Sequence, residues 1–262
     1  MNRPRIKILN TVLDNVGLEE ADAILEELYN SPGLKVIHTP NPEIVMRAAD
    51  ALPLAELVNG ADLVVADGIG LVWAAKHRKL PLKERVTGYD LSLALLKLAQ
   101  KRGGGVYLLG AAPRHGQLAM ERVNEKAPGT IVGAHHGYFR GSHMGYNDHE
   151  EEQAVLADIR ASGADILFVG LGFPKQEEWI KTHREDLEGI SIAIGNGGVI
   201  DVLSGQVKRA PEFWIRLHLE WLYRMIKEPK RLKRQLVLPK FVNKILREER
   251  AVMIWPPRKG TE

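Results

Sequence analysis

The sequence predicts an α/β protein, with a Rossmann-like, doubly wound and mostly parallel sheet followed by a C-terminal basic helical appendage. Short, mainly apolar runs alternate with segments of helical periodicity, which is typical of strands buried between two layers of helices. Hydrophobic residues make up 45% of the 262 residues and charged residues 26%, the balance of a globular protein with a sizeable core. The strand pattern stops near residue 206, so we divide the chain into a core, 1–206, and an appendage, 207–262.

Seven apolar runs of the core are expected to be strands. They cover residues 6–12, 34–38, 61–66, 106–109, 130–134, 166–169 and 190–194. Helices are expected between them. These cover residues 18–29, 42–51, 68–77, 88–102, 113–126, 148–161 and 174–183. Acidic residues in the first turn favour the first helix, and Pro42 stands at an early helical position, where its missing N–H is harmless.

The remainder of the chain shows only helical signals. They cover residues 212–227, 229–235 and 239–250, and a proline opens each of the last two. On the first of these helices Trp214 and Trp221 share an apolar face, whereas Arg216, Glu220 and Arg224 share another.

Charge is distributed unevenly along the chain, although its formal net value is only +3. Residues 1–206 contain 21 Lys and Arg against 27 Asp and Glu, whereas residues 207–262 contain 15 against 6, a net of +9. Such a basic segment suggests a polyanionic partner, which could be nucleic acid, an anionic membrane surface or a phosphate-rich substrate. A solvated helical extension accounts for the charge equally well.

The sequence excludes several classes of protein. It contains no cysteine, which rules out disulfide scaffolds, cysteine-ligated zinc, iron–sulfur clusters and thiol nucleophiles. No apolar run approaches the ~20 residues that cross a bilayer, and residues 1–7 are charged with no apolar core of a secretory signal behind them. We therefore expect a cytoplasmic protein. The histidines lack zinc spacing, and the G-x-S-x-G and Walker patterns are absent.

Ligands of open parallel sheets bind beyond the carboxyl ends of the strands, and two loops there carry polar side chains. Thr39 and Asn41 lie between two prolines and could contact a polar ligand, although spacing alone favours Asn41 as the cap of the next helix. Asp67 directly follows a buried strand. It could act as a general base, bind a metal or a ribose, or cap the following helix.

Two further loops are rich in glycine. Residues 170–177 (GLGFPKQE) would let the backbone approach a ligand closely and would offer the free N–H groups of a helix start to a phosphate. They lack the third glycine of the dinucleotide-binding pattern G-x-G-x-x-G. Residues 195–198 (GNGG) would either contact a ligand through the backbone or form a plain tight turn.

Seven segments together carry a family resemblance. They are TPNPEIV (39–45), ADLVVADGIG (61–70), RVTGYDL (85–91), VYLLG (106–110), GYF (137–139), GLGFPKQEEW (170–179) and GNGGVIDVLSGQVKRAP (195–211). In this order they resemble the WecG/TagA/CpsF family, glycosyltransferase family 26, from about residue 8 to about residue 235. The resemblance implies an inverting, metal-independent hexosyltransferase of bacterial cell-envelope polysaccharide or teichoic acid synthesis. It would need no cofactor and would move N-acetylmannosamine from UDP to GlcNAc carried on undecaprenyl diphosphate.

The resemblance also implies roles for individual residues. Asp67, in the ADG motif, would be the general base. The implied substrate-binding positions are Thr39, Asn41, Arg85, Gly110, Tyr138, Gly172, Gln176, Gly195 and Asn196, together with Arg216, Arg224 and Arg231 of the appendage. No metal ligand is implied. The histidine-rich loop around residues 141–146 is longer than the family pattern.

The expected partners are a UDP-sugar donor, a polyprenyl-diphosphate-linked sugar acceptor and an anionic membrane surface. The basic appendage would dock on the inner face of the cell membrane as a peripheral anchor and would also complete the active site. A homo-oligomer is compatible with this picture, and nucleic acid is not an expected partner.

Two alternatives stay open. One is a nucleotide-binding Rossmann enzyme of another class, such as a dehydrogenase, against which the missing G-x-G-x-x-G counts. The other is a nucleic-acid-binding module, which retained RNA and salt-sensitive binding would reveal.

Overall fold

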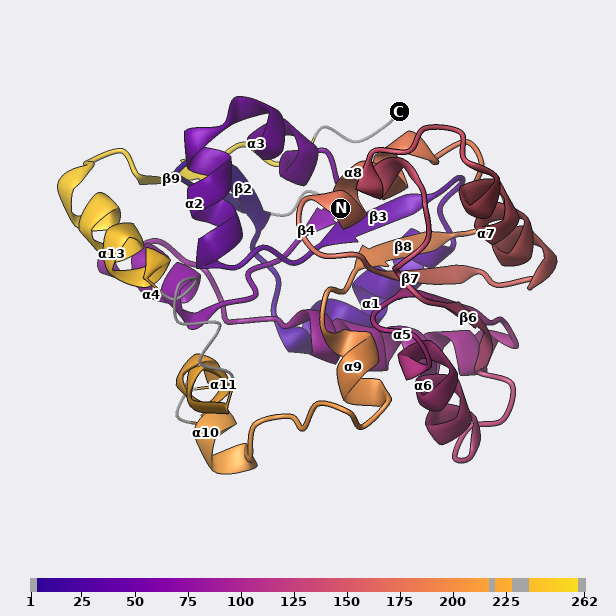
Figure 1. The fold of residues 1–262 in the computed structure, drawn as a ribbon. Coiled ribbons are helices and arrows are strands. Elements are labelled where there is room, and N and C mark those ends of the chain that lie inside the picture. Colours follow the sequence, from indigo (N-terminus) through magenta and orange to yellow (C-terminus); the bar gives the residue numbers. More distant parts are fainter. Residues whose placement is uncertain (1–3, 217–219, 228–235, 259–262) are drawn as a thin grey trace.

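The computed structural model of the chain describes residues 4–216, 220–227 and 236–258. Its centre is a six-stranded sheet in the order β4-β3-β8-β7-β5-β6, in which each neighbouring pair is parallel (Figure 1). The strands are β3 (Lys35–His38), β4 (Leu63–Val64), β5 (Val106–Gly110), β6 (Ile131–His135), β7 (Ile166–Gly170) and β8 (Ile192–Gly195). The predicted α/β class and these six parallel strands are confirmed.

Helices cover both faces of this sheet, as the doubly wound prediction requires (Figure 1). One face carries α1 (Leu18–Tyr29), α5 (Gly88–Arg102), α6 (His115–Asn124) and α9 (Val199–Leu203). The other carries α2 (Pro42–Asp50), α3 (Leu52–Asn59), α4 (Ile69–His77), α7 (Glu150–Ala161) and α8 (Lys175–Thr182). The short helices α3 and α9 were not predicted. Each layer buries its own apolar cluster against the sheet, which holds the strand ends and their loops in fixed positions.

The prediction of one strand over residues 6–12 is wrong. The segment forms a hairpin of β1 (Arg5–Ile8) and β2 (Thr11–Asp14), which pair antiparallel in a separate three-stranded sheet. Leu9 adopts a left-handed φ of +52° between the two strands and so reverses the chain. Ile6 and Ile8 are buried while Arg5 and Lys7 are half-buried, an alternation typical of a sheet that is packed on one side.

The segment after residue 206 contains α10 (Glu212–Arg216), α11 (Glu220–Lys227), α13 (Val237–Arg247) and the strand β9 (Val252–Trp255). The expectation of helices alone was therefore wrong, because β9 pairs antiparallel with β1. α13 packs on α2 and α4 and buries Phe241 and Ile245. The division of the chain at residue 206 stays a prediction. Among the described residues, no helix combines the length and the apolar character needed to cross a membrane.

Candidate active site

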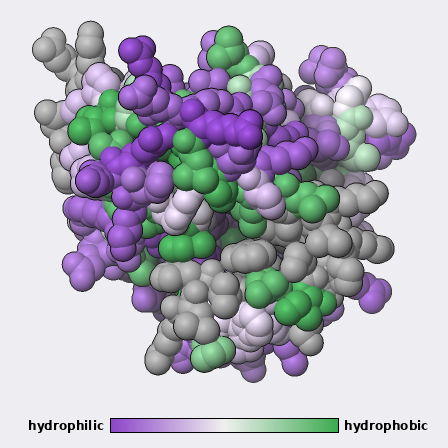
Figure 2. All heavy atoms as spheres, turned by 90° about the vertical axis from the view of Figure 1, so that its left-hand side faces the viewer, coloured by the Kyte–Doolittle hydropathy of each residue, from purple (hydrophilic) through white to green (hydrophobic). Residues whose placement is uncertain are grey.

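A cleft of about 1220 Å³ opens beyond the carboxyl ends of β3, β4 and β8. Its walls come from the loops after these strands, from the start of α5 and from α13. Figure 2 shows the side of the molecule that carries α10, α11 and α13, where hydrophobic side chains gather around a central hollow. Six of the predicted site residues line the cleft: Thr39, Asn41, Asp67, Arg85, Gly195 and Asn196.

The loops after β3 and β4 pack tightly against each other. Oδ1 of Asn41 accepts a hydrogen bond from the N–H of Ile44 at 3.1 Å, and Pro42 follows as the first residue of α2. A side-chain carbon on Gly68 would lie 2.6 Å from Cδ of Pro42, so only glycine permits this approach. Asn41 therefore caps a helix and lines the cleft at the same time.

Asp67, Arg85 and Glu220 form a row of alternating charges in the cleft wall. Nη2 of Arg85 donates to Oε2 of Glu220 at 2.7 Å, and Nε of Arg85 lies 3.5 Å from Oδ1 of Asp67. The side chains of Arg85 and Glu220 are only 15% and 7% exposed. Burial by itself would lower the pKa of Arg85, but the two carboxylates outweigh it and hold that pKa above its ordinary value. The other oxygen of Asp67, Oδ2, accepts from the N–H of Gly88 at 3.2 Å.

Gln176 and Gly172 lie behind the glycine-rich turn 195–198 and not among the residues that line the cleft. Oε1 of Gln176 accepts from the N–H of Gly172 at 3.1 Å, and Nε2 donates to Oε1 of Glu177 at 2.9 Å. A side-chain carbon on Gly195 would lie 2.7 Å from Nε2 of Gln176, so the turn rests directly on the amide. Burial raises the pKa of Glu177 to about 7. These side chains support the floor of the cleft.

The other predicted positions are placed elsewhere. Gly110, which has a φ of +133°, ends β5, and Tyr138 is 68% exposed in the loop after β6; neither lines the cleft. Arg216 and Arg224 belong to α10 and α11, but their side chains are outside the described part of the structure. Arg231 lies outside the described residues.

Comparisons with known proteins identify the family of this chain. The model of the glycosyl transferase WecG/TagA/CpsF family matches residues 6–253. The chain belongs to this family. A protein of Bacillus spizizenii is 40% identical over 217 residues, which cover 82% of this chain and 80% of that protein. One of Staphylococcus aureus (strain MRSA252) is 34% identical over 253 residues, 96% of each chain. Both relatives are named N-acetylglucosaminyldiphosphoundecaprenol N-acetyl-beta-D-mannosaminyltransferase.

Three charged residues that line the cleft of this family member, Glu43, Arg209 and Glu220, were not among the predicted site residues. Arg209 lines the cleft, with its guanidinium carbon 4.3 Å from the centre of the Tyr89 ring and Nη2 donating to Oδ1 of Asp90 at 2.9 Å. Its place in the segment 195–211, which carries part of the resemblance, was the available signal. Glu220 shares a helix face with Arg216 and Arg224 in the sequence, and the structure shows that it also reaches Arg85, 135 residues away. No local pattern contains such a contact.

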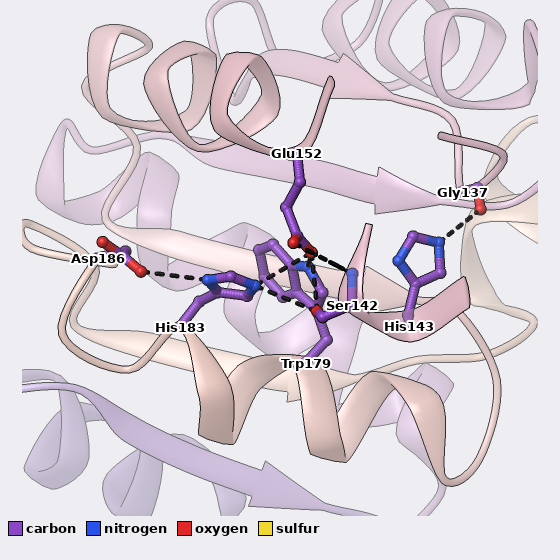
Figure 3. A network of polar contacts seen from close by, with 7 residues as sticks. All are labelled: Gly137, Ser142, His143, Glu152, Trp179, His183 and Asp186. Carbon is purple, nitrogen blue, oxygen red and sulfur yellow. Dashed lines mark hydrogen bonds and ion pairs between the residues drawn. The ribbon is translucent and has the colours of Figure 1, made fainter. Parts of the chain in front are cut away.

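The histidine-rich loop is anchored outside the cleft by a buried carboxylate (Figure 3). Glu152 is 1% exposed and accepts hydrogen bonds from the N–H and Oγ of Ser142, at 3.0 and 2.8 Å, and from Nε1 of Trp179 at 2.9 Å. Nε2 of His183 lies 3.1 Å from the same carboxylate, and Nδ1 lies 3.1 Å from Asp186. The network fixes the loop on α7 and α8. Within the described ranges, no group of three or more His, Asp or Glu residues is arranged to hold a metal ion.

Proposed function

We propose that this chain transfers N-acetylmannosamine from a UDP-sugar to GlcNAc carried on undecaprenyl diphosphate. The observation that carries the proposal is the convergence of Thr39, Asn41, Asp67 and Arg85 in one cleft at the carboxyl ends of the parallel strands. The family resemblance implies a role in substrate binding or catalysis for each of these residues. The printed activity of both relatives supports the same reaction.

In the proposed reaction the Asp67 carboxylate accepts the proton of the acceptor hydroxyl. The freed oxygen attacks the anomeric carbon of the donor sugar, the bond from that carbon to the diphosphate oxygen breaks, and UDP leaves with the electron pair. Attack opposite the leaving group inverts the configuration. A general base of this kind contributes about 10²–10⁴-fold to the rate.

The leaving diphosphate needs compensating charge. Arg85 is already held by two carboxylates, so we assign this task chiefly to Arg209, whose side chain is 31% exposed in the cleft, and to backbone N–H groups of the turn 195–198. Arg216, Arg224 and Arg231 stay candidates for the same role. Cationic and backbone donors of this kind would make transfer independent of a divalent metal.

The mouth of the cleft suits an acceptor that carries a lipid. Leu236 and Leu246 line it and are 58% and 52% exposed, while Lys240 and Arg247 are exposed on the same helix, α13. A helix with exposed leucines and basic residues is suited to the interface of an anionic membrane. We therefore propose that α13 docks the enzyme on the inner face of the cell membrane, where a lipid-diphosphate headgroup could enter the cleft.

A UDP-release assay tests the proposed function. The purified protein is incubated with a panel of UDP-sugars and a water-soluble lipid-diphosphate-GlcNAc analogue, and the disaccharide product is identified by mass spectrometry. UDP-N-acetylmannosamine should give the highest rate, and release should require the acceptor. Equal release without acceptor, or transfer of a different sugar in preference, would overturn the proposal.

A further inference from the structure

Three polar side chains of the cleft wall meet at Gly88, the first residue of α5. Its N–H donates to Oδ2 of Asp67 at 3.2 Å. A side-chain carbon on Gly88 would lie 3.0 Å from Oγ1 of Thr39 and 3.1 Å from Oδ1 of Asn196. The missing side chain of Gly88 therefore leaves Thr39, Asp67 and Asn196 grouped around one small space at the edge of the cleft.

The orientation of the Asn196 amide is fixed by its surroundings. Oγ of Ser92 donates its single hydrogen to the carbonyl oxygen of Gly88 at 2.5 Å. Toward Asn196, 2.7 Å away, the same hydroxyl can only accept, so the atom that faces it must be the donor, Nδ2. The carbonyl oxygen Oδ1 of Asn196 consequently points away from the Ser92 hydroxyl, toward the space beside Gly88.

This oxygen needs a hydrogen-bond donor that the described residues do not supply. Asn196 is only 2% exposed, and its Oδ1 is buried without a partner in the described part of the chain. Other buried oxygens in the same situation, such as Oγ1 of Thr11 and Oε2 of Glu177, belong to residues that do not line the cleft. A buried acceptor without a partner is costly, and its position in the cleft wall allows a bound ligand to supply the missing donor.

We propose that Oδ1 of Asn196 accepts a hydrogen bond from an N–H or O–H group of the transferred hexose and so selects sugars that carry a donor at this position. The inference rests on the proposed function, because it places the sugar beside Asp67. Diphosphate oxygens carry no hydrogen at neutral pH and would be repelled by Oδ1. The uracil and the ribose lie beyond the diphosphate from the anomeric carbon, so the hexose is the part of the donor that can reach both Asp67 and Asn196.

The test compares the binding of UDP and of UDP-N-acetylmannosamine, by calorimetry without acceptor, to the wild type and to Asn196→Leu. Leucine has a similar size but lacks the carbonyl oxygen that would accept the hydrogen bond from the sugar. Affinity for the UDP-sugar should fall about 10- to 100-fold, as expected when a buried donor of the sugar is left unpaired, while affinity for UDP stays within about 3-fold. UDP-sugar analogues that each lack one N–H or O–H of the hexose then identify the group. One of them should bind the wild type more weakly yet bind Asn196→Leu as well as the parent sugar does.

Ser92→Ala provides a second variant should Asn196→Leu fail to fold. This variant keeps Oδ1 of Asn196 but removes the hydroxyl that fixes the orientation of the amide. It should therefore weaken UDP-sugar binding by a smaller factor than Asn196→Leu does and leave UDP binding unchanged. Equal losses of affinity for UDP and for the UDP-sugar, or unchanged affinity for both, would each overturn the inference. A wild-type protein that transfers no sugar would instead count against the proposed function.

Discussion

Replacing Asp67 by asparagine separates the chemical role of this carboxylate from its structural one. Asparagine is nearly isosteric and can still accept from the N–H of Gly88, so the bond at 3.2 Å is retained. What is lost structurally is the ion pair with Arg85 at 3.5 Å, in which the Asp67 side chain is 29% exposed, a contribution of at most about 1 kcal/mol. Losing a general base costs about 10²–10⁴-fold in rate, roughly 3–5 kcal/mol of activation free energy. Turnover should therefore fall far more than stability.

The assay measures UDP release with saturating donor and a water-soluble acceptor, alongside UDP affinity and thermal unfolding. Asp62→Asn is the matched control. Asp62 directly precedes β4, the strand that Asp67 follows, and it accepts from the N–H of Val36 at 2.8 Å but does not line the cleft. The control should keep wild-type turnover. If Asp67→Asn turned over within a few-fold of wild type, or if both variants lost activity equally, Asp67 would not be the base.

Three further outcomes are expected. Transfer should continue in EDTA, because arginine and backbone donors can offset the diphosphate charge; loss of activity that Mg²⁺ or Mn²⁺ restores would contradict this. Glu177→Gln should be more stable than wild type at pH 8.5, by up to about 3 kcal/mol. The reason is that, between about pH 4.5 and pH 7, Glu177 keeps its proton in the folded state but loses it in the unfolded state. Wild-type stability therefore falls as the pH rises through that window. Urea unfolding should show the difference closing at pH 4.5, and a constant difference would refute it. Lys240→Glu combined with Arg247→Glu should weaken binding to anionic liposomes by at least about 1 kcal/mol per basic residue, without changing turnover on a soluble acceptor; binding as tight as wild type would exclude α13 as the docking surface.

The main sheet could be predicted from the sequence because a parallel strand covered on both faces is a continuous apolar run. The three-stranded sheet of β1, β2 and β9 could not be predicted in this way. The run at residues 6–12 looks like one strand, because a single turn-forming residue, Asn10, is a weak sign that Leu9 reverses the chain at a positive φ. The pairing of β1 with β9 sets Arg5 opposite Trp255, and only the folded chain brings such distant residues together.

The predictability of the site follows the same distinction. Thr39, Asp67 and Asn196 follow three strands whose carboxyl ends meet, so the topology alone brings them together. Gln176 also follows a strand, but a side chain at a helix start can turn either into a cleft or beneath it. Here it turns beneath, where Gly172 and Glu177 use both polar atoms of the amide. The sequence pattern therefore predicts where the loop lies, but packing determines the direction in which the side chain points.

The ion pair between Arg85 and Glu220 links the surroundings of the proposed base to the segment after residue 206. Removing either partner from such a buried pair leaves an uncompensated charge, which typically costs about 3–5 kcal/mol. Arg85 also pairs with Asp67, and Glu220 is buried beside the arginine at the start of α11. Docking of α11 therefore brings a buried carboxylate against Arg85. The arginine next to Asp67 pairs with a carboxylate that lies 135 residues after Arg85 in the sequence, so α11 contributes to the electrostatics of the cleft.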